Sequence, residues 1–215
     1  MPDDAQPFLQ ADPPTAVRLS QTLGVAATMF NEPISASRDV VAFVVRGLVL
    51  YSLAEFQAGH CTTIRVDANA GSFSVSDDGR GHAIERTVVD TPYLQFIYTH
   101  FDYPFVPGRE ALVQLHGIGM SLINILCSEL TLTVRKPHMS LRMFFRDGSL
   151  IGQETIEASY DSTGNRISGI VAPPFSRSAD EQALVRWMHE VKAASPSLKL
   201  HFNNLEVHGP SPSDA

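Results

Sequence analysis

Two adjacent carboxylates, Asp77 and Asp78, end the alternating run SFSVSD and are followed by a Gly-Arg-Gly turn, residues 79–81. A buried carboxylate at the end of a strand can accept a hydrogen bond from an exocyclic amine such as that of adenine. Glycines at 79 and 81 would leave room beside it for a flat base. Asp and Gly are also ordinary turn residues, so the motif alone leaves a ligand site and a plain surface turn both open.

A second glycine motif, His116-Gly117-Ile118-Gly119, opens a segment with helical periodicity. A helix N-terminus presents unpaired backbone N–H groups and the positive end of the helix dipole, and glycines let a phosphate approach them. The four residues therefore suit a phosphate cradle. A tight turn without a ligand fits the same pattern, so this motif also leaves two interpretations open.

The first half of the chain contains the elements that must position these motifs. A weak helical pattern covers 15–30, and a central helix buried on most faces is predicted from the N-cap Ser37 to Gly59. Strands at 62–68 and 72–77 are predicted to pair as a hairpin. A helix over Val88–Thr99 and a long loop over 100–114 are expected to follow.

The second half is predicted to begin with the glycine-rich turn and an amphipathic helix within 115–130. A hairpin turning at 136–138 and a further strand pair across 153–173 come next. A capping box of Ser178 and Glu181 starts the last helix, which leads to a strand at 198–203. Hairpin-connected strands with helices gathered around them predict an α+β fold, a two-layer α/β sandwich with a mixed, mostly antiparallel sheet.

The bulk composition excludes several classes of protein. The chain has 215 residues, 44% of them hydrophobic and 18% charged, which predicts one domain over 15–207 with disordered tails at 1–14 and 208–215. A net charge of −7 argues against direct nucleic-acid binding. The N-terminus is unlike a signal peptide, and a cytoplasmic protein without membrane association is expected. Cys61 and Cys127 are expected to be free and buried, and no zinc site is expected.

Together the motifs resemble a known family. The stretch FQAGHCTTIRVDANAGSFSVSDDGRG, followed by LHGIGMSLINILCSELTLTVRK, resembles the ATPase domain of the DNA gyrase B subunit and its type IIA topoisomerase relatives. These belong to the GHKL superfamily, which also includes histidine kinases. The similarity runs from about Val40 to Gly148, with a weaker echo in ALVRWMHEVKAASPSLKLHF. The resemblance implies a Bergerat-type α/β sandwich.

By this resemblance Asp77 binds the adenine amino group, directly and through an ordered water. Gly79 and Gly81 form the floor under the base. Arg80 lies over the base edge and pairs with Glu55 on the central helix. A plain surface ion pair of small energy is the alternative for these last two residues.

The resemblance also assigns the phosphates and one strand residue. The phosphates are held at the second glycine motif, by His116, Gly117, Ile118 and Gly119. The family has a threonine that contacts the adenine-bound water on a late strand. Ser168 is the best match for it here, and Thr163 is the second choice.

The chain departs from the family on the central helix. The glutamate that activates the attacking water falls on Gly47, the magnesium-binding asparagine on Tyr51, and the neighbouring aspartate on Leu50. A phenol is a poor magnesium ligand. Glu55 is expected to be occupied by its arginine partner and Asp78 to point away if the strand alternates, so neither is expected to substitute. Catalytic residues are therefore not assigned.

These departures predict a degenerate, stand-alone gyrase-B-like domain, a pseudo-ATPase that binds ATP or ADP without Mg²⁺ and acts as a binding or regulatory module, with a protein as its further partner. The transducer and DNA-cleaving parts of the family are not expected in this chain. Two alternatives stay open: an ATPase whose missing groups come from a partner, and an interaction protein that keeps the fold without binding nucleotide.

Overall fold

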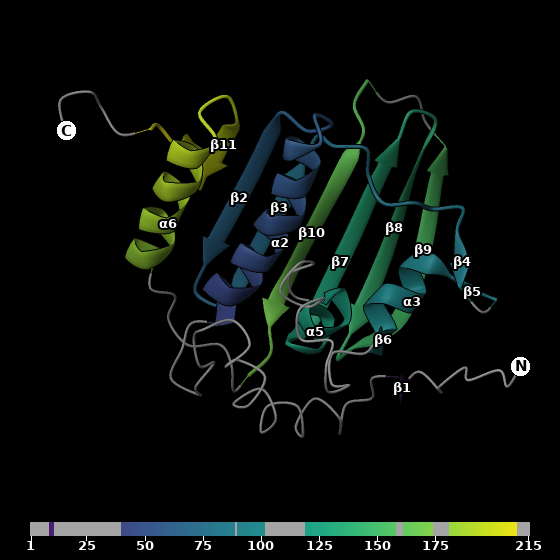
Figure 1. Ribbon diagram of the computed structural model, residues 1–215. Helices are drawn as coiled ribbons and strands as arrows, with labels where there is room; N and C mark the ends of the chain where they lie inside the picture. Colours follow the sequence, from purple (N-terminus) through teal and green to yellow (C-terminus); the bar gives the residue numbers. More distant parts are fainter. Residues whose placement is uncertain are drawn as a thin grey trace, which may run out of the picture.

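The computed structural model describes residues 9–10, 40–88, 90–101, 119–157, 161–173 and 181–209. An eight-stranded sheet forms the frame of this part (Figure 1). Its strands are β2 (Thr63–Asn69), β3 (Ser72–Asp77), β7 (Cys127–Lys136), β8 (Met139–Arg146), β9 (Ser149–Glu157), β10 (Gly164–Val171), β11 (Lys199–Phe202) and β12 (Leu205–Glu206). Their order is β12-β11-β2-β3-β10-β7-β8-β9. Only β11 and β2 pair in parallel, so the sheet is mixed and mostly antiparallel.

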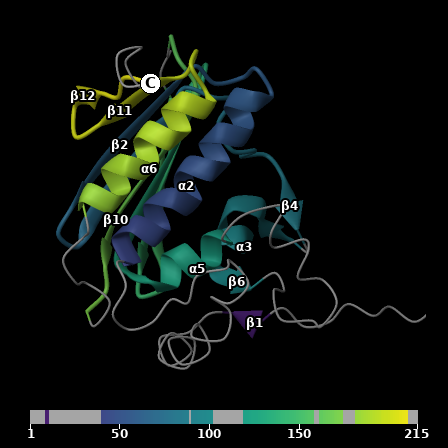
Figure 2. The ribbon, with the colours of Figure 1, turned by 60° about the vertical axis from the view of Figure 1, so that its left-hand side comes forward.

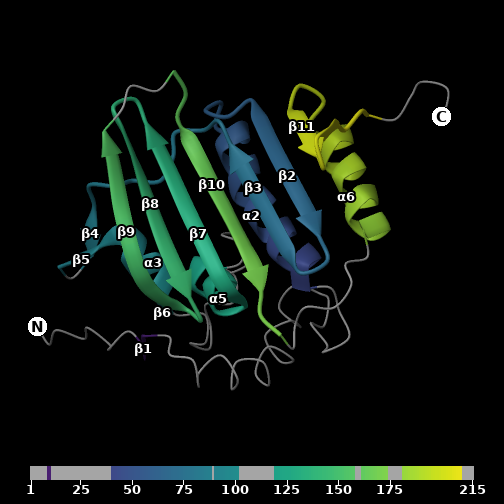
Figure 3. The ribbon, with the colours of Figure 1, turned by 180° about the vertical axis from the view of Figure 1, so that it is seen from behind.

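Four described helices cover one face of this sheet: α2 (Val40–Gln57), α3 (Tyr93–Thr99), α5 (Met120–Ile125) and α6 (Glu181–Ala194). Helices α2 and α6 run side by side (Figure 2), with α2 packed on β2 and β3 and α6 on β11. Helix α5 contacts β7, and α3 contacts β9. The opposite face carries none of them (Figure 3). Two small strand pairs complete the described elements: β1 (Leu9–Gln10) with β6 (His100–Phe101), and β4 (Thr87–Val88) with β5 (Thr91–Pro92). The two-layer α/β sandwich predicted from the sequence is confirmed.

Helix α2 is the central element of the helical layer. By length and composition it would suit a membrane span, but its buried residues, among them Val45, Leu48 and Val49, belong to the same core cluster as the inner face of the sheet. The helix ends in a turn at Gly59, where φ is +78° and His60 N donates to the carbonyl of Glu55. The predicted C-terminal stop of this helix is therefore confirmed.

Several other elements agree with the sequence. The β2–β3 and β7–β8 hairpins form as predicted, and β11 covers the predicted last strand. Cys61 and Cys127 are free and buried, as expected. Burial raises the pKa of the Cys61 thiol to about 12, with smaller contributions from neighbouring carboxylates, so this thiol stays protonated at neutral pH.

Three predicted elements are wrong in extent or pairing. The helix predicted from Val88 begins only at Tyr93, because Pro92 and the preceding residues form the β4–β5 pair around Asp90, whose φ is +61°. The helix predicted within 115–130 ends at Ile125, and strand β7 begins at Cys127. Strands β9 and β10 do not pair with each other: β9 pairs with β8, and β10 lies between β3 and β7.

Other predictions lie outside the described residues. These are the helical pattern at 15–30, the N-cap Ser37, the capping residue Ser178, most of the loop over 100–114, and the greater part of both tails. The predicted domain limits, 15–207, stay a prediction.

Candidate functional site

Asp77 ends strand β3 with a buried carboxylate that is already hydrogen-bonded. Its side chain lies beneath the helical layer, with only 8% of the residue exposed. Oδ2 accepts a hydrogen bond from the Ser52 hydroxyl of α2 at 2.9 Å. Oδ1 accepts from the backbone N–H of Gly79 at 3.0 Å and of Asn165 at 3.3 Å. The carboxylate therefore ties α2, the turn after β3 and the start of β10 to one point.

The Asp78 side chain points away from that of Asp77, because successive side chains of a strand point to opposite faces. Its Oδ1 accepts from the backbone N–H groups of Thr62 at 2.7 Å and Thr63 at 2.8 Å, which begin β2. Burial alone would raise the pKa of Asp78, but the hydrogen bonds from Thr62 and Thr63 outweigh it and hold the pKa well below its usual range. The prediction that Asp78 points away from Asp77 is confirmed.

This arrangement predicts an acid-sensitive contribution to stability. The pKa of Asp78 is lower in the folded protein than its ordinary value of 3.8, so its stabilisation is complete above about pH 4 and is lost as the pH falls below it. We expect Asp78→Asn to lower the free energy of unfolding by roughly 1 kcal/mol at pH 7, a small value because the site is partly solvated.

Urea unfolding at pH 7 and at pH 3 tests this expectation. The difference in the free energy of unfolding between wild type and Asp78→Asn should shrink at pH 3. At that pH the ionised carboxylate contributes less to the stability of the wild type. A difference that stays constant or grows between the two pH values would contradict it.

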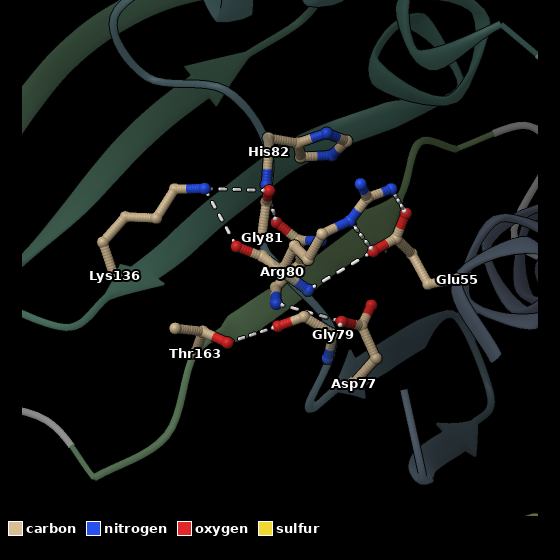
Figure 4. A network of polar contacts seen from close by, with 9 residues as sticks. Glu55, Asp77, Gly79, Arg80, Gly81, His82, Lys136 and Thr163 are labelled. Carbon is tan, nitrogen blue, oxygen red and sulfur yellow. Dashed lines mark hydrogen bonds and ion pairs between the residues drawn. The ribbon is translucent and has the colours of Figure 1, made fainter. Parts of the chain in front are cut away.

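The turn that follows Asp77 is held by side chains from distant strands (Figure 4). Lys136 Nζ donates to the carbonyls of Arg80 and Gly81, at 2.9 and 3.0 Å. The Thr163 hydroxyl donates to the carbonyl of Gly79 at 2.6 Å. The turn is therefore fixed at successive carbonyls by residues from the end of β7 and the approach to β10.

Glycine is required at Gly81 by both conformation and space. Its φ is +71°, a region that L side chains rarely adopt. A Cβ at this position would also lie 3.1 Å from the carbonyl oxygen of Arg135 and 3.1 Å from a methyl carbon of Val134. The turn thus packs its backbone directly onto strand β7, with no room for a side chain.

Glu55 and Arg80 form the ion pair that the resemblance implied. Arg80 Nη2 lies 2.7 Å from Glu55 Oε1, and Arg80 Nε donates to Oε2 at 3.0 Å. The Arg80 backbone N–H reaches the same Oε2 at 3.3 Å. The hydrogen bond from Arg80 is the main cause that lowers the pKa of Glu55. The pair joins α2 to the turn, with the Arg80 side chain still 61% exposed.

The chain is similar to known proteins in sequence and in fold. The chain is 28% identical over 163 residues to the DNA gyrase B subunit of Campylobacter jejuni, covering 73% of this chain and 21% of the relative. It is 38% identical over 90 residues to the DNA gyrase B subunit of Haloferax volcanii, covering 40% of this chain and 14% of the relative. A solved topoisomerase IV ATP-binding domain from Francisella tularensis, in complex with a small-molecule inhibitor, superposes with a TM-score of 0.65 at 20% identity, covering 77% of this chain and 85% of that one.

The chain is gyrase-B-like: it is similar in sequence to DNA gyrase B subunits and has the fold of a GHKL ATP-binding domain. No protein-family profile matches the chain. The chain spans only about a fifth of the length of the Campylobacter relative.

The central helix of this gyrase-B-like domain carries no ionised group at the positions that diverge. Gly47 is buried and has no side chain, and Leu50 is 50% exposed. The Tyr51 ring packs against the core cluster. Burial, with a smaller contribution from Tyr93, raises the pKa of Tyr51 to about 12, so its hydroxyl is neutral at physiological pH.

An aromatic side chain of α3, Tyr98, contacts His82, the residue that follows the turn. Tyr98 stacks on Phe145 of β8, with ring centroids 5.3 Å apart and 21° between the planes. It meets the His82 ring edge-on at 6.4 Å. Asn124 of α5 donates from Nδ2 to the carbonyls of Tyr98 at 2.8 Å and Gly148 at 2.9 Å, which fixes α3 against α5. Burial lowers the pKa of His82, so its imidazole is neutral at pH 7.

Only Gly119 of the predicted phosphate cradle lies within the described residues. His116, Gly117 and Ile118 lie outside the described residues. Gly119 is the N-cap of α5, with extended backbone and no side-chain cap, and its carbonyl accepts from Leu122 N at 3.0 Å. Phosphate binding at this motif stays a prediction.

The structure does not bring Ser168 to Asp77. In the antiparallel register Ser168 lies opposite Ser74, three residues before Asp77 along β3. The residue whose backbone N–H reaches Asp77 is instead Asn165, and Thr163, the second choice, binds the carbonyl of Gly79. The β10 residue that contacts Asp77 is therefore Asn165 and not Ser168.

Sequence reasoning missed several contributors. Ser52 gave no signal, because a lone serine on a buried helix is common. Lys136 was assigned to a hairpin turn, yet its amine reaches back to the earlier turn. Asn165 adjoins a Thr-Gly pair whose glycine was the available clue, because glycine in a strand often marks close approach of another backbone. The remaining missed residues, His82 and Tyr98, carry no local motif.

Proposed function

We propose that this gyrase-B-like domain binds an adenine nucleotide, ATP or ADP, and acts as a binding or regulatory module without efficient hydrolysis. The supporting observation is a contrast within one site. The buried carboxylate of Asp77 and the glycine turn beside it are held by hydrogen bonds from other elements. Helix α2, by contrast, carries Gly47 and Tyr51 at the positions where ATP hydrolysis would need a general base and a metal ligand.

Asp77 retains capacity for a ligand amine. An ionised carboxylate has about four lone-pair positions. Among the described residues Oδ1 accepts two backbone N–H groups, while Oδ2 accepts only the Ser52 hydroxyl. One position on Oδ2 is therefore left for an exocyclic amine. The Ser52 hydroxyl keeps its own acceptor lone pairs next to the same point.

The described residues at the positions where the resemblance puts magnesium chemistry do not fit Mg²⁺. The cation prefers carboxylate, amide and water oxygens, and Tyr51 offers only a neutral phenol whose pKa is about 12. Within the described ranges, no group of three His, Cys, Asp or Glu side chains is placed to hold a metal. This donor set supports nucleotide binding that does not depend on magnesium.

Calorimetry with ADP and with a non-hydrolysable ATP analogue, each with and without Mg²⁺, tests the proposal. We expect binding that is unchanged by Mg²⁺. Asp77→Asn should weaken it about 10- to 100-fold, since a hydrogen bond to a charged acceptor is lost.

Asp78→Asn is the matched control. It changes the adjacent carboxylate in the same way, but Asp78 faces the start of β2, so nucleotide affinity should stay at the wild-type value. No heat with either nucleotide at millimolar concentration would refute nucleotide binding.

The inward position of Tyr51 favours a second candidate, an interaction protein that keeps the fold without binding nucleotide. The ring packs against the core at the place where the resemblance puts a magnesium ligand. If this ring closes the pocket, the wild-type domain binds no nucleotide and Tyr51→Ala gains binding. If the first proposal holds, Tyr51→Ala brings no gain over the wild type.

A further inference from the structure

The side-chain amide of Asn165 lies beside Asp77 with its own donors unused. Asn165 follows Gly164 in β10, and its backbone N–H donates to Asp77 Oδ1 at 3.3 Å. The side-chain oxygen of Asn165, Oδ1, accepts from the backbone N–H of His82 at 2.9 Å. Among the described residues no group accepts a hydrogen bond from Nδ2 of the same amide. Both N–H donors of Nδ2 are therefore available next to the carboxylate.

The contact with His82 determines which way the amide points. A backbone N–H donates to an oxygen and not to an NH₂ group, so Oδ1 is the atom that faces His82. Nδ2 is on the other side of the same planar amide and points away from that N–H. The backbone of Asn165 is also held, by Asp77 and by the pairing of β10 with β3. The free donors are thus oriented before a nucleotide binds.

Asn165 and Asp77 are on the same face of the sheet, the face that the helices cover. Ile167 of β10 lies opposite Val75 of β3, and both belong to the buried core. Asn165 and Asp77 are each two residues along their strands from this pair, so they share its face. Asn165 is only half-buried. In the described part of the chain, the side-chain polar atoms that are both buried and unpaired belong to other residues, so Nδ2 keeps accessible surface.

An acceptor and a donor side by side match the edge of an amine-bearing base. Asp77 Oδ2 has a lone-pair position left for an exocyclic amine. In adenine that amine is flanked by the ring nitrogens N1 and N7, which accept hydrogen bonds. Guanine carries a carbonyl oxygen in place of the amine, and this oxygen would face the carboxylate of Asp77. The Nδ2 donor of Asn165 complements a ring nitrogen of adenine in the same way as Asp77 complements its amine.

We propose that Asn165 is a specificity-determining residue of the nucleotide site, and that its Nδ2 donates directly to a ring nitrogen beside the exocyclic amine of adenine. This inference rests on the proposed function and deepens it. The resemblance gives a late strand a threonine that contacts a water bound to the adenine. The longer carboxamide of Asn165 contacts the base itself and needs no bridging water.

Asn165→Asp tests this role by changing one atom. The variant keeps Oδ1 as acceptor for the His82 N–H and replaces the NH₂ donor by an oxygen. Calorimetry without Mg²⁺ compares ADP with 1-deaza-ADP and 7-deaza-ADP, which lack N1 and N7 respectively. We expect one of these analogues to bind the wild type about 10-fold more weakly than ADP, the loss of one neutral hydrogen bond. Asn165→Asp should weaken ADP about 10-fold or more and should bind that same analogue at least as tightly as ADP.

Asn69→Asp is the matched control. Asn69 Oδ1 also accepts a hydrogen bond, from the Ser72 hydroxyl at 2.6 Å, and the residue lies at the opposite end of β3 from Asp77. The control adds the same charge, and its affinities should match the wild type.

The ratio between ADP and the analogues separates base recognition from general damage to the site. If the wild type binds both analogues as tightly as ADP, or if Asn165→Asp weakens ADP and both analogues by the same factor, the inference is overturned and nucleotide binding stays intact. If the wild type does not bind ADP, the proposed function fails and the inference fails with it.

Discussion

Gly164→Ala is expected to destabilise the domain by about 4 kcal/mol, at the upper end of single-substitution effects. Gly164 has φ of +132°, where L residues are rarely found. An added Cβ would overlap the carbonyl oxygen of Asp77 and lie 3.1 Å from the Cα of Asp78. Both obstacles are backbone atoms, so the clash is relieved only by separating β10 from the end of β3.

Urea unfolding of Gly164→Ala and Gly59→Ala measures this effect. Gly59 also has positive φ, +78°, but nothing lies within 4 Å of its added Cβ. The control should therefore lose only about 1 kcal/mol, the cost of left-handed backbone strain. Equal losses in the two variants would show that close approach of the strands at Gly164 contributes nothing.

ATP hydrolysis by the domain alone is expected to be slower by several orders of magnitude than catalysis with a positioned base and a bound metal. Gly47 offers no side chain, and the Tyr51 phenol is neutral with a pKa of about 12. Glu55 is bound to Arg80, and the oxygens of Asp77 are hydrogen-bonded to Ser52 and to backbone N–H groups. The one position left on Asp77 Oδ2 is the one we assign to the ligand amine, so none of these side chains is expected to activate a water.

Phosphate release at saturating ATP, with and without Mg²⁺, checks the expected rate against a no-protein control. Glu55→Gln should leave the background rate unchanged, because Glu55 acts here as the partner of Arg80. Magnesium-dependent release by the domain alone, abolished in Asp77→Asn, would contradict the prediction. Release that appears only when another protein is added would instead support an ATPase completed by a partner.

The sequence predicted the local parts of the site correctly, because they depend on residues close together in the chain. Alternation along β3 is enough to send Asp77 and Asp78 to opposite faces. The hairpins β2–β3 and β7–β8 follow from alternating runs and turn residues. The pairing of Glu55 with Arg80 came from the family resemblance, since the two residues are 25 positions apart.

Predictions failed where short apolar runs or strand partners had to be chosen. The segment around Cys127 is apolar enough for a helix or a buried strand, and periodicity alone does not separate them over so few residues. Strand β10 was predicted to pair with β9, because hairpins join strands that are neighbours in sequence. The structure places β10 between β3 and β7 and leaves β9 on β8.

The sequence by itself determined the class of fold, the buried central helix, and the carboxylate and glycine turn that end β3. Only the tertiary structure decided which residues brace that turn. Lys136, Thr163 and Asn165 reach it from 55 to 84 positions away, and the register of β10 puts Asn165 there in place of Ser168. The physical reason is that alternation and turn chemistry act between neighbours in the chain, whereas strand order and register are set by packing across the whole sheet.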